Sequence, residues 1–172
     1  MRMELQSTEV GLGTTDASQI GQRGTYGWIL TGGGRCQCSS GKALSKTRDM
    51  DSNRMELHGL MSLMAGAWRM KKFRLIKAKY DNKSVVDGYE KIRKCEKGGG
   101  VGEFPKFNHS VDLWEEVRYW RGLWDGAFQL EWHKGHPEKR DPTRLSWCIN
   151  DWMSHVAGRV AAAEYGRSGG DD

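Results

Sequence analysis

The sequence predicts an α/β protein with a five-stranded mixed sheet and helices on both faces of that sheet. Segments that alternate apolar with polar residues, a pattern typical of strands, open the chain and recur twice further on. Segments with apolar residues at helical spacing fall between the later strands and after the last one. A length of 172 residues suits one domain that buries a sizeable core.

The first three strands are expected to form an antiparallel meander. Val10 to Thr14 alternates apolar and small residues and predicts a strand that ends at Asp16. A turn over 21–24 leads to a second strand over 25–31. Three glycines at 32–34 then predict a hairpin turn into a third strand near 35–41.

The next segment predicts a helix followed by a strand. Asn53 is a good N-cap, and Glu56 three positions later completes a capping-box pattern. Apolar residues at helical spacing then extend the helix to about Arg69. Residues 73–80 alternate apolar with basic side chains, as a strand with one solvated face would, and Asp81 follows that strand.

Helices and strands alternate in the remainder of the chain. In order, we expect a helix over 83–95, a flexible Lys- and Gly-rich loop over 94–102, a helix over 111–120, a strand over 127–133 and a closing helix over 151–164. Because helices separate the later strands, these strands should run parallel through right-handed crossovers. The predicted domain spans 9–164, between a flexible N-terminus over 1–8 and a disordered tail over 165–172.

Composition narrows the possible partners and compartments. Lys and Arg total 27 against 22 Asp and Glu, which favours an anionic partner such as nucleic acid or reflects solubility alone. No apolar run approaches the roughly 20 residues that span a bilayer, and no secretory signal is present, so we expect an intracellular protein, cytoplasmic or nuclear, with no membrane partner. Core positions are expected for five of the tryptophans: Trp28, Trp114, Trp120, Trp132 and Trp152. Trp124 and Trp147 lie nearer to predicted loops.

Three acidic residues lie at element ends that can converge on one edge of the sheet: Asp16, Glu56 and Asp81. Several carboxylates brought together need cations to offset their repulsion, and Mg²⁺ prefers such hard oxygen ligands. Two ions about 4 Å apart can activate a water and stabilise a leaving oxygen during phosphodiester hydrolysis. The alternative is that the two aspartates only begin turns and the glutamate only caps its helix.

Four segments together resemble the type 1 ribonucleases H and the ribonuclease H domains of reverse transcriptases, over about 8–164. Residues 15–18, Thr-Asp-Ala-Ser, are similar to the Thr-Asp-Gly-Ser end of that family's first strand. Residues 53–57, Asn-Arg-Met-Glu-Leu, match its helix-start motif, and Asp81 resembles its third acid. Residues 132–136, Trp-His-Lys-Gly-His, resemble its fifth strand and histidine loop.

The resemblance implies a metal-dependent endonuclease that cleaves the RNA strand of RNA/DNA hybrids and leaves a 3′-hydroxyl and a 5′-phosphate. It implies two Mg²⁺ ions, with Mn²⁺ as a substitute, and an origin in a retroelement reverse transcriptase, which would make a reverse transcriptase domain a partner. Asp16 would bridge both ions, Glu56 and Asp81 would complete the pair, and His136 would assist product release or proton transfer.

Five residues are candidates for substrate binding: Ser18, Asn53, Asn82, Lys91 and Lys94. The two asparagines border the acids and could recognise 2′-hydroxyl groups, which distinguish RNA from DNA. The two lysines belong to a basic segment that either holds the DNA-strand phosphates or is an ordinary solvated helix face.

The fourth acid of the family is where the sequence departs from the pattern. The run over 154–161 resembles the corresponding part of the family's last helix and puts Gly158 at that position. Asp151 lies seven residues earlier, about 10 Å along a helix axis, and cannot simply replace it. Either the helix begins differently and Asp151 is the ligand, or one ligand is lost at Gly158, which we favour. A lost ligand leaves two further functions open: an impaired module that binds hybrid or duplex without cleaving it, or a structural domain from a larger polyprotein.

Overall fold

The computed structural model describes residues 9–20, 23–44, 52–97, 104–134 and 163. Five strands form one sheet in the order β3-β2-β1-β4-β5. Their bounds are Glu9–Ile20 for β1, Arg23–Gly32 for β2, Arg35–Leu44 for β3, Phe73–Tyr80 for β4 and Phe128–Trp132 for β5. The first three strands pair antiparallel, whereas β4 runs parallel to both β1 and β5. The predicted mixed sheet, with its meander and parallel crossovers, is confirmed.

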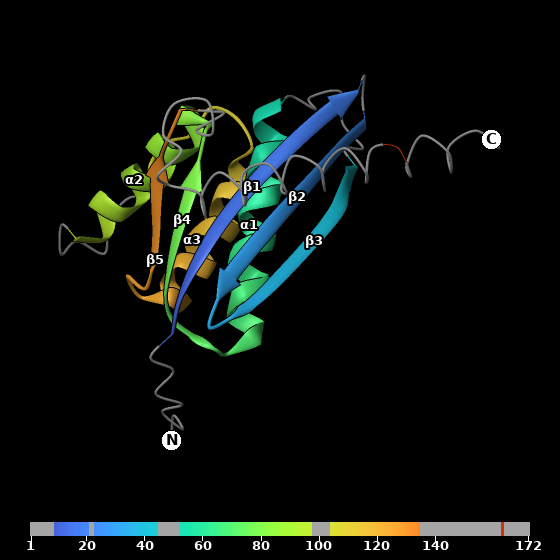
Figure 1. Cartoon of the computed structure of the whole chain (residues 1–172). Helices are drawn as coiled ribbons and strands as arrows, with labels where there is room; N and C mark the ends of the chain where they lie inside the picture. Colours follow the sequence, from blue (N-terminus) through green and yellow to red (C-terminus); the bar gives the residue numbers. More distant parts are fainter. Residues whose placement is uncertain (1–8, 21–22, 45–51, 98–103, 135–162, 164–172) are drawn as a thin grey trace.

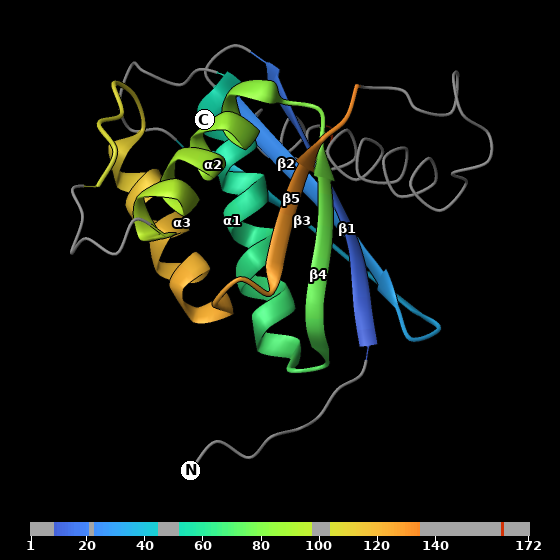
Figure 2. The same ribbon diagram turned by 90° about the vertical axis from the view of Figure 1, so that its left-hand side faces the viewer.

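Three helices pack on one face of this sheet, as Figures 1 and 2 show from two directions. They are α1 (Ser52–Met70), α2 (Lys83–Lys97) and α3 (Val111–Trp124). Helix α1 lies against β1 and β2, and α3 packs on α1. The closing helix predicted over 151–164, on which the second helical layer depends, lies outside the described residues. No helix in the described ranges is long and apolar enough to cross a membrane.

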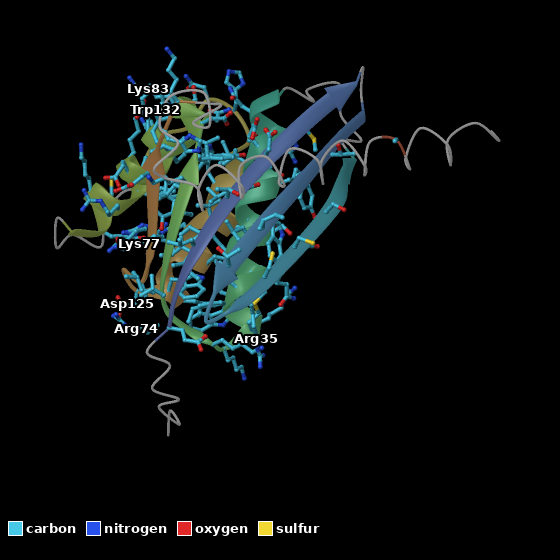
Figure 3. All side chains as sticks on the ribbon, in the orientation of Figure 1. Arg35, Arg74, Lys77, Lys83, Asp125 and Trp132 are labelled. Atoms are coloured by element: carbon cyan, nitrogen blue, oxygen red, sulfur yellow. The ribbon has the colours of Figure 1, made fainter. Side chains whose placement is uncertain are left out.

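The core lies between the helices and the sheet. Ile76, Ala78 and Tyr80 of β4 are buried against the helices, whereas Lys77 is exposed (Figure 3). Helix α1 contributes an apolar stripe of fully buried residues that includes Leu57, Leu60, Leu63 and Met64. Each buried side chain of this kind contributes about 2 kcal/mol of transfer free energy. In β4, the burial of Ile76, Ala78 and Tyr80 and the exposure of Lys77 confirm the alternation predicted for the fourth strand.

Two glycines on one face of α1 let the helix lie close to the sheet. A Cβ atom at Gly59 would lie 2.5 Å from Thr15 Oγ1, and one at Gly66 would lie 2.7 Å from Trp28 Cζ2. Residues seven apart share a helix face, so both glycines point at the sheet. The short distance between α1 and the sheet at these glycines brings the first turns of α1 next to β1.

The β2–β3 hairpin forms as predicted. Gly33 and Gly34 have φ values of 58° and 73°, the left-handed conformation that a tight two-residue hairpin turn needs. Gly32 pairs with Arg35 across this turn.

Several predicted boundaries were wrong. Strand β1 does not end at Asp16, because its pairing with β2 continues to the pair of Ile20 with Arg23. Helix α2 continues to Lys97, so the first part of the segment assigned to a flexible loop is helical. Helix α3 also continues one turn past the predicted end.

Tryptophan placement was predicted in part. Trp28 and Trp114 are buried, as expected. Trp124 ends α3 next to a loop, as expected, but it is buried and its indole N–H donates a hydrogen bond to the carbonyl of Met64, so its exclusion from the core positions was wrong. Trp132 is 47% exposed at the end of β5, so its predicted core position was wrong as well.

Candidate metal centre

The three predicted acids converge where β1 separates from β4. The last residue pair in the parallel register of these strands is Thr14 with Lys79. Asp16 and Asp81 each follow that pair by two residues, just past the end of the parallel β1–β4 register. Glu56 approaches from the N-terminal part of α1. One carboxylate oxygen from each acid lies within 4.8 Å of the other two.

Crowding and burial act strongly on Glu56. Burial raises the pKa of Glu56 to about 8, the hydrogen bond from Tyr80 opposes this rise, and the neighbouring charges of Asp16 and Asp81 add to it. Without a cation, Glu56 is therefore largely protonated at pH 7. A divalent cation would remove this repulsion, and a set made only of carboxylate oxygens suits Mg²⁺ or Mn²⁺. The residues present fit such an ion.

Neighbouring donors hold the acids. The Tyr80 hydroxyl contacts the Glu56 carboxylate and lies 2.8 Å from the Glu56 carbonyl oxygen. Burial and the adjacent Glu56 raise the pKa of Tyr80 well above its ordinary value, so the phenol keeps its proton. The Trp132 indole N–H donates to the Asp81 carbonyl at 3.0 Å. Asp16 accepts a hydrogen bond from the backbone N–H of Ala17 at 2.9 Å.

Two asparagines connect the starts of α1 and α2. Asn82 caps α2, because its Oδ1 accepts the backbone N–H of Val85 at 3.1 Å. Its Nδ2 donates to Asn53 Oδ1 at 3.0 Å. The prediction that Asn53 caps α1 was wrong: the helix begins at Ser52, and the Asn53 side chain binds Asn82 instead. Asn82 directly follows Asp81 in the chain, and Asn53 lies three residues before Glu56 on α1; their contact with substrate stays a prediction.

A pocket of about 380 Å³ begins at Asn53 and runs along α2 toward the start of α3. Its lining includes Lys91 and Lys106, and its apolar side is formed in part by Phe107 and Trp114, whose rings stack at 4.5 Å. Lys91 thus lies in this pocket, whereas Lys94 is exposed on α2 and is not among its lining residues. Lys106 belongs to a segment without helical or strand periodicity, so the sequence pattern gave no signal for it.

His136, Asp151 and Gly158 lie outside the described residues. Ser18 is in β1, two residues past Asp16, but its side chain is outside the description. The described part of the predicted centre is therefore the triad of Asp16, Glu56 and Asp81 with its surrounding donors.

No protein-family model and no curated protein matches the chain. Solved structures do match. The RNase H1 of the halophilic archaeon Halobacterium salinarum is 15% identical with a TM-score of 0.51, and the match covers 83% of this chain and 98% of that one. The N-terminal RNase H domain of Rv2228c from Mycobacterium tuberculosis is 15% identical with a TM-score of 0.56, covering 91% and 98%. This protein has the ribonuclease H fold.

A viral ribonuclease H domain shares the architecture. The RNase H domain of prototype foamy virus is 11% identical with a TM-score of 0.56, and the match covers 88% of this chain and 94% of that one. Against the protease-reverse transcriptase of the same virus, the chain covers only 21% of the larger protein. Within this ribonuclease H fold, the acids occupy the first strand, the first helix and the end of the fourth strand, where the resemblance in sequence placed them.

Proposed function

We propose that this protein is a divalent-metal-dependent endonuclease that hydrolyses the RNA strand of RNA/DNA hybrids. The observation that carries the proposal is the convergence of Asp16, Glu56 and Asp81, with carboxylate oxygens within 4.8 Å of one another, on a ribonuclease H fold. One structural neighbour, a foamy viral protease-reverse transcriptase, was solved in complex with an RNA/DNA hybrid. That neighbour supports the substrate class.

The carboxylates would hold two Mg²⁺ ions, with Mn²⁺ as a substitute. Ions held in this way activate water and stabilise the leaving oxygen of a phosphodiester. Carboxylate oxygens of the three acids lie within 4.8 Å of one another, and the family resemblance implies that Asp16 would contact both ions. Asp151 would add a fourth carboxylate only where the last helix begins differently from the family pattern, and His136 would assist proton transfer or product release.

The Asn53–Asn82 pair lies at the rim of the acids and is our candidate for contact with the RNA strand. Amide groups can donate to and accept from 2′-hydroxyls, which DNA lacks. The pocket begins at the same Asn53, so a duplex with one strand at the acids would place its other strand along α2. There Lys91 and Lys106 would bind phosphates of the DNA strand. Ser18 and Lys94 stay candidates for substrate binding.

We further propose a retroelement origin, which the foamy virus neighbours support. Four of the foamy virus matches are to a protease-reverse transcriptase, and in the first of these the chain covers 21% of that protein. We propose that this chain corresponds to the ribonuclease H part of such an enzyme and works beside a reverse transcriptase domain.

A second function is favoured by one feature of the sequence. By the family resemblance, Gly158 stands at the position of the fourth acid. Loss of that ligand would weaken the binding of one ion and leave the pocket and the Asn53–Asn82 pair unchanged. The protein would then bind hybrid or duplex nucleic acid without cleaving it.

The test uses the full chain and a hybrid labelled on its RNA strand. Cleavage is expected with Mg²⁺ or Mn²⁺, none with EDTA, and none with Asp16→Asn. Duplex DNA and duplex RNA of the same sequence serve as substrate controls. An inert wild-type protein that still binds hybrid in a salt-dependent manner would refute the enzyme and support the binding module.

A further inference from the structure

The last residues of β4 and β5 each contact one of the acids. Tyr80 and Trp132 are partners in the parallel β4–β5 ladder. Tyr80 is fully buried, and its hydroxyl reaches both the carboxylate and the carbonyl oxygen of Glu56. Because Tyr80 also precedes Asp81 in the chain, this one side chain links the end of β4 to the first turns of α1. It therefore fixes the position of Glu56 relative to Asp81.

The Trp132 side chain contacts the backbone of the other acid, Asp81. Asp81 follows the last residue of β4, beyond the β4–β5 register. The Trp132 indole N–H donates to the Asp81 carbonyl, and the next residue, His133, donates its backbone N–H to the Tyr80 carbonyl at 2.9 Å. Trp132 is 47% exposed, and the hydrogen bond to the Asp81 carbonyl is a specific contact that orients its indole.

We propose that Tyr80 and Trp132 are positioning residues that hold Glu56 and Asp81 at the spacing a divalent cation requires. The inference rests on the proposed function only in taking the acids as metal ligands. Neither side chain supplies a ligand of its own: the tyrosine holds a carboxylate directly, and the tryptophan holds the backbone that carries one. Outer partners of this kind typically alter metal affinity by about 10- to 100-fold.

The same two contact types occur elsewhere in the core and supply matched controls. The Tyr89 hydroxyl donates to the carbonyl of Phe128 at 2.7 Å, and the Trp124 indole donates to the carbonyl of Met64 at 3.1 Å. Tyr89→Phe and Trp124→Phe therefore remove a hydroxyl and an indole donor without touching the acids. A purely structural role predicts that site and control variants behave alike.

The experiment compares Tyr80→Phe with Tyr89→Phe, and Trp132→Phe with Trp124→Phe, in the full chain. Titration calorimetry with Mn²⁺ alone, thermal unfolding, and kcat and KM on hybrid are measured for each. We expect Tyr80→Phe and Trp132→Phe to weaken Mn²⁺ binding by about tenfold or more. Their kcat should fall while KM changes little. The controls should lose thermal stability and keep wild-type Mn²⁺ affinity.

Mn²⁺ affinities that match between site variants and controls would overturn the inference. A wild-type protein that binds Mn²⁺ without cleaving hybrid would refute the proposed function alone, because the affinity comparison still decides the positioning roles. A wild-type protein that binds no Mn²⁺ would overturn both.

Discussion

Glu56 should make the ion-free protein less stable as the pH rises from 4.5 to about 8. Its ordinary pKa is 4.5, and burial with the adjacent acids raises the pKa of Glu56 to about 8 in the folded state. Between these values the folded protein binds more protons than the unfolded chain, so the free energy of unfolding falls with increasing pH. The stabilisation is fully present below pH 4.5 and is lost by about pH 8. At about 1.4 kcal/mol for each of the roughly 3.5 pH units, the loss is at most about 5 kcal/mol.

Urea unfolding in EDTA at pH 5, 6.5 and 8 measures this slope. Glu56→Gln keeps the shape of the side chain and removes its titration, so it should flatten the dependence and stabilise the protein at pH 8. Glu131→Gln, on an exposed glutamate of β5, is the control and should keep the wild-type slope. Equal slopes for wild type and Glu56→Gln would refute the reasoning. Adding Mg²⁺ should restore more stability at pH 8 than at pH 5, because the ion competes with a proton at low pH.

Four further outcomes follow from the structure. Tyr80→Phe should raise the pKa of Glu56 above 8, because the Tyr80 hydrogen bond lowers it, and carboxyl-carbon NMR titration of the ion-free protein would detect the change. Gly59→Ala should destabilise the fold by about 1–3 kcal/mol, since its Cβ would lie 2.5 Å from Thr15 Oγ1; denaturant unfolding unchanged from wild type would contradict this. Lys91→Ala and Lys106→Ala should each reduce the slope of log binding constant against log salt concentration by about 1 for hybrid binding, as measured by fluorescence anisotropy. Lys77→Ala, at an exposed lysine on the other face of β4, is the control. Asp151→Asn should abolish cleavage if Asp151 is the fourth ligand, and an undiminished rate would remove it from the site.

The acids were predictable from sequence because each belongs to a short local motif and the alternation of helices and strands dictates parallel pairing. The parallel register of β1 with β4 runs to Thr14 and Lys79 and so brings Asp16 and Asp81 toward the same edge. The end of β1 was not predictable in the same way, since it depends on how far a different strand continues alongside it.

The errors at Asn53 and Trp132 have a common cause. Residue propensity predicted that Asn53 caps a helix, and periodicity predicted that Trp132 lies in the core. Instead, both side chains form hydrogen bonds with residues just after β4: Asn53 with Asn82, and Trp132 with the Asp81 carbonyl. Tyr80 was correctly placed on the buried face of its strand, but the pattern of burial carries no information about what its hydroxyl reaches. Local patterns fix which face a residue occupies, and tertiary contacts decide its partner.

Gly59 and Gly66 have a consequence for how this chain tolerates mutation. Neither residue carries a group that could take part in chemistry, yet their missing side chains set the depth at which α1 and its Glu56 sit over the sheet. Even one added methyl would act as a spacer under the helix and move a carboxylate away from its two neighbours. In a saturation library selected for metal-dependent activity, these two positions should therefore tolerate as few substitutions as the acids themselves.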